Sequence, residues 1–157
     1  MRFLYIDRVT RLERGKSISG IKTFPLSEAY LKGHFSKAPL IPGSLLIEAM
    51  AQIAGWLVVY SYDFMTSCVI SIMEEVRVPS SLRPGAAVQV HGEMTDTNRR
   101  GSLCRAWVEQ DGETIAEGGR LVFPHFKTGD PAWLIQRFRC HGWLDGEVVP
   151  APPGGSL

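Results

Sequence analysis

A histidine, a glutamate and a glutamine stand close together in the sequence and have side chains that can move protons. His34 lies in a loop punctuated by glycine and proline, and Glu48 and Gln52 follow in an otherwise apolar stretch. An imidazole can take up a proton near neutral pH and a carboxyl group can donate one, so His34 and Glu48 could act as base and acid. A lone histidine is more often structural, and it is the combination that predicts a proton-transfer site.

The stretch around Glu48 predicts one long helix, from about Pro42 to residues 60–62. Proline suits the first helical position because its missing N–H would have no intrahelical partner there. Apolar residues occupy nearly every face of this helix, so we expect it to be buried on all sides. A glutamate in such a place loses most of its hydration, which is costly unless the carboxylate is paired. Ser44, Glu48 and Gln52 recur every four residues and form one narrow polar stripe.

The start of the predicted helix supplies a third kind of group. The first backbone N–H groups of a helix have no partner within it and carry a partial positive charge. Pro42-Gly43 stands at this position. Such a helix start can hold a carbonyl oxygen that becomes negative during a reaction. Base, acid and oxyanion donor in one short stretch are the parts of a proton-transfer site.

The segments on either side of the helix predict a single antiparallel sheet. Six runs are rich in β-favouring residues and bounded by turn residues, at about 3–13, 17–24, 68–78, 86–97, 102–110 and 113–123. Asp111-Gly112, between the last two runs, is a strong two-residue hairpin signal. Successive hairpins and one apolar helix predict an α+β fold in which an antiparallel sheet wraps around one long central helix.

We expect one domain with a C-terminal extension. Residues 1–123 contain the predicted sheet and helix and form the domain. Residues 124–148 form the extension, which begins with a linker and in which Pro131–Phe138 predicts a short amphipathic helix. Residues 149–157 contain three prolines and two glycines, which is typical of a disordered tail.

Composition and charge are those of an ordinary globular protein. Of 157 residues, 45% are hydrophobic and 21% are charged, and a formal net charge of +1 gives no reason to expect nucleic acid as a partner. The first residues carry charges too early for a signal peptide. The longest charge-free apolar stretch, Ala49 to Tyr62, is shorter than the roughly 20 residues that a membrane span needs. We therefore expect a cytoplasmic protein with no membrane span.

The cysteines favour the same compartment. Cys68, Cys104 and Cys140 form no Cys-x-x-Cys spacing and cannot all pair with one another, which is typical of thiols that stay reduced. His141 follows Cys140, but no third and fourth ligand stand nearby in the sequence. We expect no metal site.

The run around the predicted site resembles the signature of the β-hydroxyacyl-(acyl carrier protein) dehydratases, which have the hot-dog fold. The matching residues read Gly-His-Phe at 33–35, Pro39, Pro-Gly at 42–43 and Glu-Ala-Met-Ala-Gln at 48–52. Residues 3–9 resemble the opening strand of that family, and residues 76–79 and 83–85 resemble its mid-domain strand and turn. The resemblance covers roughly residues 1–123 and implies a hot-dog fold, in agreement with the predicted order of elements.

The resemblance implies the dehydration of (3R)-3-hydroxyacyl thioesters to trans-2-enoyl thioesters and a role for each site residue. His34 would remove the proton α to the thioester carbonyl, and Glu48 would protonate or orient the departing β-hydroxyl. The backbone N–H of Gly43 would bind the thioester oxygen, and Gln52 would hold the carboxylate in position. Glutamate at position 48 resembles the branch that only dehydrates, since the branch that also isomerises the double bond has aspartate.

The resemblance also implies partners. In that family the histidine and the glutamate meet across a dimer interface, so we expect a homodimer or a larger oligomer of dimers. The substrate would be an acyl chain linked through phosphopantetheine to an acyl carrier protein. No cofactor is implied.

Two departures from the family pattern stand near the predicted site. Ser36-Lys37-Ala38 replaces the usual Pro-Gly after the His-Phe pair, and Ser44 replaces a position that is commonly aliphatic. Serine in place of proline loosens the loop, and alanine in place of glycine disfavours a positive φ. From these departures and the C-terminal extension we expect a specialised dehydratase of a secondary lipid, polyketide or polyene pathway.

Two other functions stay open at the level of sequence. An acyl thioesterase could use the same scaffold, because a fold does not determine a function. Thioesterases activate water at a carboxylate and do not need a histidine in this register, so His34 favours the dehydratase. The altered loop also allows a non-catalytic, dehydratase-like subunit that completes a heterodimer.

Overall fold

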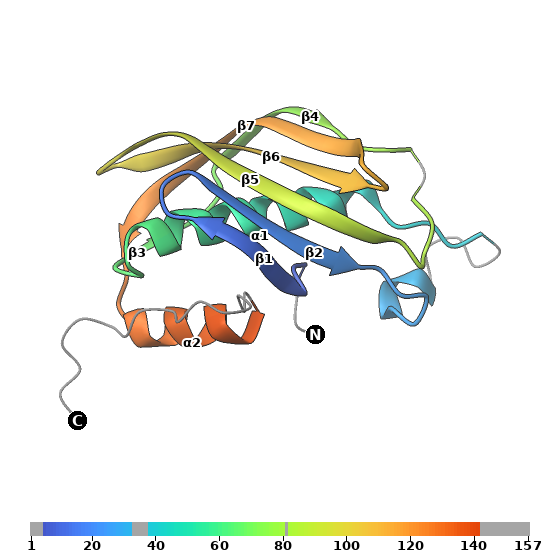
Figure 1. Ribbon diagram of the computed structural model, residues 1–157, viewed down its shortest axis with the longest axis horizontal. Helices are drawn as coiled ribbons and strands as arrows, with labels where there is room; N and C mark the ends of the chain where they lie inside the picture. Colours follow the sequence, from blue (N-terminus) through green and yellow to red (C-terminus); the bar gives the residue numbers. More distant parts are fainter. Residues whose placement is uncertain (1–4, 33–37, 81, 142–157) are drawn as a thin grey trace.

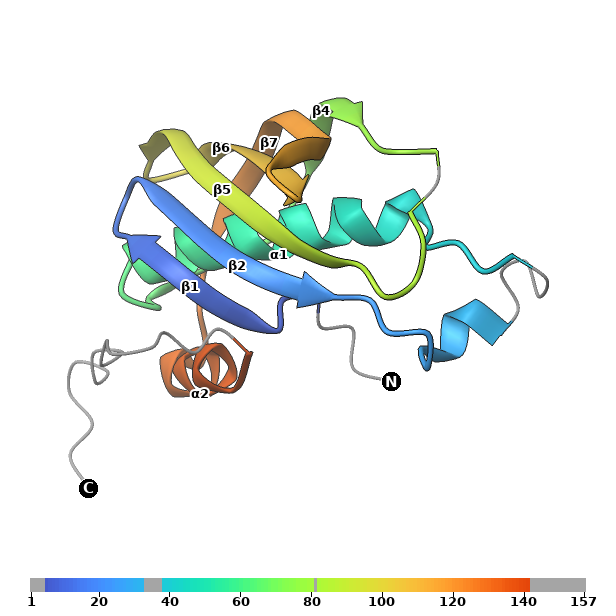
Figure 2. The ribbon, with the colours of Figure 1, turned by 45° about the vertical axis from the view of Figure 1, so that its right-hand side comes forward.

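One antiparallel sheet curls around a single long helix in the computed structural model, which describes residues 5–32, 38–80 and 82–141 (Figure 1). Seven strands are present in the described residues: β1 (Arg8–Glu13), β2 (Ser17–Thr23), β3 (Thr66–Cys68), β4 (Ile72–Arg77), β5 (Ala87–Asn98), β6 (Gly101–Gln110) and β7 (Glu113–Lys127). Helix α1 (Gly43–Ser61) lies in the concave face of the sheet, and a short 3₁₀ turn (Ala29–Lys32) precedes it (Figure 2). Helix α2 (Pro131–His141) follows the last strand. The predicted α+β architecture is confirmed.

The strands follow the order β1-β2-β5-β6-β7, and both β3 and β4 pair with β7. The prediction of one strand over 68–78 is wrong, because β3 and β4 lie end to end along the same side of β7 (Figure 1). Cys68 pairs with His125 and Ile72 with Val122, so the break faces the stretch of β7 that contains Pro124. Proline has no N–H to give to a neighbouring strand, which accounts for the interruption of the ladder there.

The hairpin between β6 and β7 forms where the sequence predicts it. Asp111 and Gly112 both have positive φ, at 53° and 83°, as a two-residue turn of the I′ type requires. Strand β7 continues beyond the predicted end at Phe123 as far as Lys127. The predicted linker is therefore shorter, because β3 pairs with residues 125–127 and extends the strand.

Two glycines let α1 lie close against the sheet. A Cβ added to Gly20 of β2 would come within 3.0 Å of Ile53 Cδ1, and one added to Gly92 of β5 would be 3.4 Å from Ala54 Cα. The buried residues of α1 are all apolar: Leu46, Ala49, Met50, Ala51, Ile53, Ala54, Leu57, Val58 and Val59. All of them except Ala51 belong to the hydrophobic core.

Helix α1 is also long and apolar enough, by length and composition alone, to cross a membrane, and 44% of its most apolar window is buried inside the protein. The core helix of a soluble domain passes the same test. Its packing inside a curled sheet accounts for its composition.

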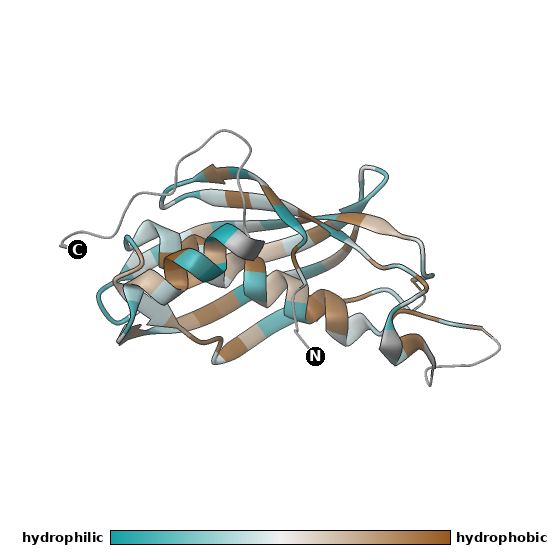
Figure 3. Ribbon diagram, turned by 90° about the horizontal axis from the view of Figure 1, so that it is seen from below, coloured by the Kyte–Doolittle hydropathy of each residue, from teal (hydrophilic) through white to brown (hydrophobic). Residues whose placement is uncertain are grey.

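Helix α2 covers the side of α1 that faces away from the sheet, near the C-terminal end of α1 (Figures 1 and 2). Apolar and polar residues alternate along α2, as Figure 3 shows from below. Phe138 is fully buried, with its ring centroid 5.3 Å from that of Trp56, 5.9 Å from Tyr60 and 5.6 Å from Phe64. The predicted short helix is thus present and is joined to the core by an aromatic cluster.

Candidate active site

The polar stripe of α1 lies on a face that the sheet leaves open. Glu48 and Ser44 are exposed in the single chain, and Gln52 is half-buried. The expectation that Glu48 is buried is therefore wrong for the isolated chain. The sheet wraps only part of the helix, so an apolar composition on nearly every face does not mean burial on every face.

Glu48 is held by a chain of two hydrogen bonds. Gln52 Nε2 donates to Glu48 Oε1 at 2.8 Å, and the backbone N–H of Tyr5 donates to Gln52 Oε1 at 3.0 Å. The amide of Gln52 is thus fixed from one side and presents its donor to the carboxylate from the other. Gln52 therefore contacts the carboxylate that the sequence analysis expects it to hold, and its role in a reaction stays a prediction. Tyr5 is 47 residues away from Gln52 in the sequence, so no local sequence pattern predicts this hydrogen bond.

The start of α1 presents free backbone donors next to this stripe. Pro42 is the N-cap residue, and no side chain caps the first turn. An isolated β-bridge anchors the preceding residue, with Ile41 N donating to Leu82 O at 2.8 Å. Within the first turn the N–H of Leu45 donates to Pro42 O at 3.0 Å, whereas the N–H groups of Gly43 and Ser44 have no hydrogen-bond partner among the described residues. An oxyanion could bind there, which is the role that the sequence predicts for Gly43.

Gly43 is needed at the helix start because a side chain has no room there. A Cβ at this position would lie 2.8 Å from Val78 Cγ2 and 3.1 Å from Val78 Cβ. Val78 directly follows β4, so this contact joins the start of α1 to the edge of the sheet.

We predict that Gly43→Ala lowers the free energy of unfolding by about 1–3 kcal/mol, because the added methyl group overpacks the contact with Val78. The double variant Gly43→Ala with Val78→Ala should recover most of this loss, and Val78→Ala alone serves as its control. Urea denaturation of the four proteins measures the effect. Equal stability of the wild type and Gly43→Ala would contradict the steric explanation.

An apolar groove begins at the stripe and runs beside α1. It has a volume of about 380 Å³, and Glu48 and Gln52 lie on its wall together with Gly55, Trp56 and Val59 from later turns of the helix. The segment between β3 and β4 contributes Val69 and Ile70, and β7 contributes Phe123. A ligand with an apolar chain and a polar head could place its head at Glu48 and its chain along the helix.

The other groups singled out in the sequence lie in different places. His34 is outside the described residues. Burial raises the pKa of the thiols of Cys68 and Cys104 to about 12, which favours their protonated form. The side chain of Cys140 is outside the description.

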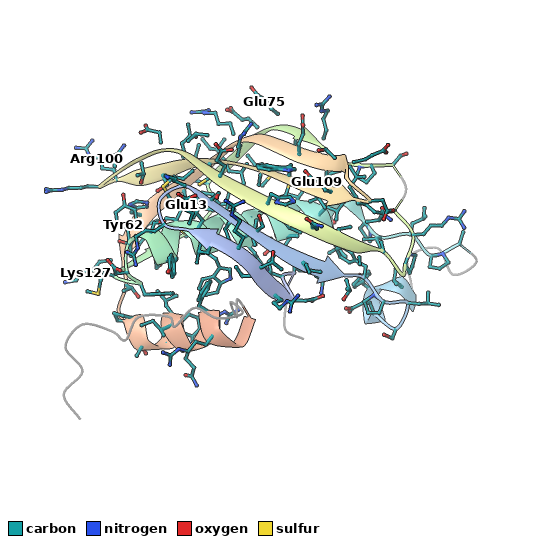
Figure 4. All side chains as sticks on the ribbon, viewed as in Figure 1. Glu13, Tyr62, Glu75, Arg100, Glu109 and Lys127 are labelled. Atoms are coloured by element: carbon teal, nitrogen blue, oxygen red, sulfur yellow. The ribbon has the colours of Figure 1, made fainter. Side chains whose placement is uncertain are left out.

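Two arginines of the sheet are ion-paired, and a third lies at the tip of a hairpin. Arg77 is ion-paired with Glu117, and Arg105 Nε donates to Glu93 Oε2 at 2.7 Å. Arg100 lies at the tip of the hairpin between β5 and β6, at the end of the molecule where α1 finishes (Figure 4). A ligand at Glu48 would therefore be remote from Arg100.

The described part of the site combines a positioned carboxylate, a helix start whose Gly43 and Ser44 N–H groups have no partner among the described residues, and an apolar groove. The carboxylate can exchange a proton with a polar group of a ligand, and the helix start can stabilise negative charge on an oxygen. These functions suit an acyl compound with a carbonyl group near its polar end.

Sequence comparison identifies relatives over most of the chain. The model of the FabA-like domain matches residues 1–119. The 3-hydroxyacyl-(acyl-carrier-protein) dehydratase FabZ of Clostridioides difficile is 33% identical over 124 residues, which cover 77% of this chain and 85% of that protein. The enzyme of the same name from Caldanaerobacter subterraneus is 34% identical over 122 residues, covering 77% and 86%.

Solved structures share the fold at low sequence identity. The conserved protein PA5202 of Pseudomonas aeruginosa aligns with a TM-score of 0.61 at 18% identity, covering 76% of this chain and 87% of that one. The thioesterase HI1161 of Haemophilus influenzae aligns with a TM-score of 0.60 at 9% identity, covering 77% and 79%. These similarities confirm the predicted hot-dog fold, and the sequence relatives decide the family. The chain belongs to the FabA-like family, among the 3-hydroxyacyl-(acyl-carrier-protein) dehydratases that its signature resembles.

Proposed function

We propose that the protein dehydrates (3R)-3-hydroxyacyl thioesters to trans-2-enoyl thioesters, with His34 as the base and Glu48 as the acid. The observation that carries the proposal is the hydrogen-bonded series from Tyr5 through Gln52 to Glu48, at the mouth of an apolar groove. The series orients one carboxylate toward a place where an acyl chain and its polar head can both be accommodated. Family membership supplies the reaction class.

The proposed reaction removes one water and needs two proton transfers. His34 takes the proton from the carbon α to the thioester carbonyl, and the electron pair forms the new carbon–carbon double bond. The bond between the β-carbon and its oxygen breaks, and Glu48 supplies the proton that turns the departing hydroxyl into water. Negative charge that develops on the thioester oxygen is stabilised by the N–H of Gly43 at the start of α1.

We propose that the site is completed by a second copy of the chain. Among the described strands, β4 pairs only with β7, so its other edge is open. Apolar side chains on and beside β4 are exposed. The exposed fractions are 59% for Val69, 45% for Ile72, 36% for Val76 and 39% for Val78. An apolar strand edge of this kind favours pairing with another strand, and two-fold pairing of identical edges gives a closed dimer.

The proposed interface would lie next to the site. Val78 contacts the start of α1, so a partner at the β4 edge would approach Gly43 and Glu48. A partner there would also cover the open polar stripe and could bring its own His34 to Glu48. The exposure of Glu48 in the single chain is compatible with this arrangement, because the covering surface would belong to the partner.

We further propose an acyl carrier protein as the donor of the substrate, through its phosphopantetheine arm, and a cytoplasmic setting. The relatives are named as dehydratases of 3-hydroxyacyl groups on acyl carrier protein. The free thiols of Cys68 and Cys104 suit a reducing compartment. Fatty-acid synthesis is the general setting, and the altered loop at 36–38 is our reason for placing the protein in a polyketide, polyene or other specialised branch.

Mixing two inactive variants tests the shared site. His34→Ala and Glu48→Gln are each expected to be inactive, and dimers that contain one chain of each keep one intact site. Statistical exchange should restore about a quarter of the wild-type activity, since half of the dimers are mixed and each has one site of two. Formation of the enoyl thioester is followed by its ultraviolet absorbance.

The outcomes separate the competing functions. Activity that does not return on mixing, although mixed dimers form, would contradict a site shared between chains. Release of free thiol from saturated acyl thioesters would favour the thioesterase. A wild-type protein that is silent alone and active only with a different subunit would favour the non-catalytic partner.

A further inference from the structure

Helix α2 forms part of the wall of the groove that begins at Glu48. Trp133, Leu134 and Arg137 of α2 line the groove together with the open face of α1. The family model matches residues 1–119, and α2 lies beyond them. The groove is therefore bounded on one side by an element outside the matched residues.

The groove follows the axis of α1 away from Glu48. Its α1 residues occupy successive turns, from Glu48 through Gln52 and Gly55 to Val59. At a rise of about 1.5 Å per residue, Val59 lies roughly 16 Å along the helix from Glu48. The anchor of α2, Phe138, packs against Trp56 in the later part of α1. The α2 wall thus borders the part of the groove that is distant from the carboxylate.

The distant part of the groove is suited to an alkyl chain. Gly55 leaves space between α1 and the strands, since a Cβ there would be 3.7 Å from Phe123 Cε1 and 3.9 Å from Cys68 Sγ. Trp133 is 51% exposed, which leaves a large apolar surface in contact with water. Arg137 lies over the Trp133 ring, with its guanidinium carbon 5.1 Å from the ring centroid, and restrains the indole. An alkyl chain in the groove would remove this apolar surface from water.

We propose that α2 is the element that recognises the distal part of the acyl chain, with Trp133 as its main contact, and that it makes the protein favour long acyl chains over short ones. The inference rests on the proposed function, because that function places the thioester at Glu48 and directs the chain along α1. Short chains end before they reach α2, whereas long chains gain the contact with Trp133.

The test measures binding and turnover as a function of chain length in the full-length protein. Saturated acyl-pantetheine thioesters of increasing length are titrated by calorimetry, and the corresponding 3-hydroxyacyl thioesters are assayed for dehydration. Each methylene that enters the groove should tighten binding about fourfold. Trp133→Ala should weaken binding of the long chains about tenfold and leave the short chains unchanged.

Two further variants locate the contact. Gly55→Val should obstruct the groove midway, so its loss of affinity should begin at a shorter chain length than that of Trp133→Ala. Gln136→Ala, at an exposed position of the same helix that does not line the groove, should keep the wild-type profile. Trp133 is half-exposed, so we expect Trp133→Ala to fold, and its circular dichroism spectrum checks this.

The two readouts separate the inference from the proposed function. If the wild type dehydrates its substrates but Trp133→Ala has an unchanged chain-length profile, the inference is overturned and the function stands. If no thioester is dehydrated but the binding profile shifts as expected, the function is wrong and the distal contact holds. A profile that changes equally in Gln136→Ala would also overturn the inference.

Discussion

Replacing Glu48 by glutamine is expected to lower kcat/KM for dehydration by about 10²–10⁴-fold, the usual contribution of a general acid. In this protein Gln52 Nε2 donates to Glu48 Oε1 at 2.8 Å. Glutamine at position 48 keeps the size of the side chain and an oxygen that can accept this hydrogen bond. It cannot deliver a proton to the departing hydroxyl. The loss should therefore fall on the chemical step, and it is measured by ultraviolet absorbance of the enoyl thioester under single-turnover conditions.

Ser44→Ala is the matched control for this change. Ser44 lies one turn earlier on the same exposed stripe, and the proposed reaction gives its hydroxyl no part. Its kcat/KM should remain within about twofold of wild type, and the stability of both variants should change by no more than about 0.5 kcal/mol, as is usual for surface positions. Full dehydration by Glu48→Gln would remove the glutamate from the proposed mechanism.

Replacing Phe138 by alanine is expected to lower the free energy of unfolding by about 3–5 kcal/mol, the range for phenylalanine in a well-packed core. Its side chain is fully buried, and its ring contacts those of Trp56, Tyr60 and Phe64. Truncation would remove these contacts and leave a cavity between α2 and α1. Denaturation in urea, followed by tryptophan fluorescence, measures the loss.

An exposed phenylalanine of the same chain provides the comparison. Phe126 is 51% exposed on β7, so Phe126→Ala should change the stability by much less. If Phe138→Ala were as stable as Phe126→Ala, α2 would not be an integral part of the fold. That result would also remove the fixed wall on which the chain-length inference depends.

Features that depend on neighbouring residues were predictable from the sequence. The I′ turn at Asp111-Gly112 follows from residues that tolerate positive φ. The predicted helix matches α1, because proline at its start and an unbroken run of helix-compatible apolar residues act locally. The contact between Glu48 and Gln52 follows from the helical period, which places residues four apart on the same face.

Features that depend on distant segments were not predictable. The run at 68–78 has the composition of one strand, and only its pairing with β7 around Pro124 divides it into β3 and β4. The space requirement at Gly43 arises from Val78, which follows a strand later in the chain. Likewise, amphipathicity predicts the helix α2 but not the surface against which it packs.

The surroundings of Glu48 depend partly on neighbouring residues and partly on distant segments of the chain. Residue types and spacing alone determined that Glu48 and Gln52 share a face and that the helix begins beside them, because these relations are set within a few turns of one helix. The tertiary structure decided that this face is open, that Tyr5 fixes Gln52, and that a groove bounded by α2 begins there. Exposure and shape depend on how far the sheet curls and where the C-terminal segment returns, and both are set by contacts between residues far apart in the sequence.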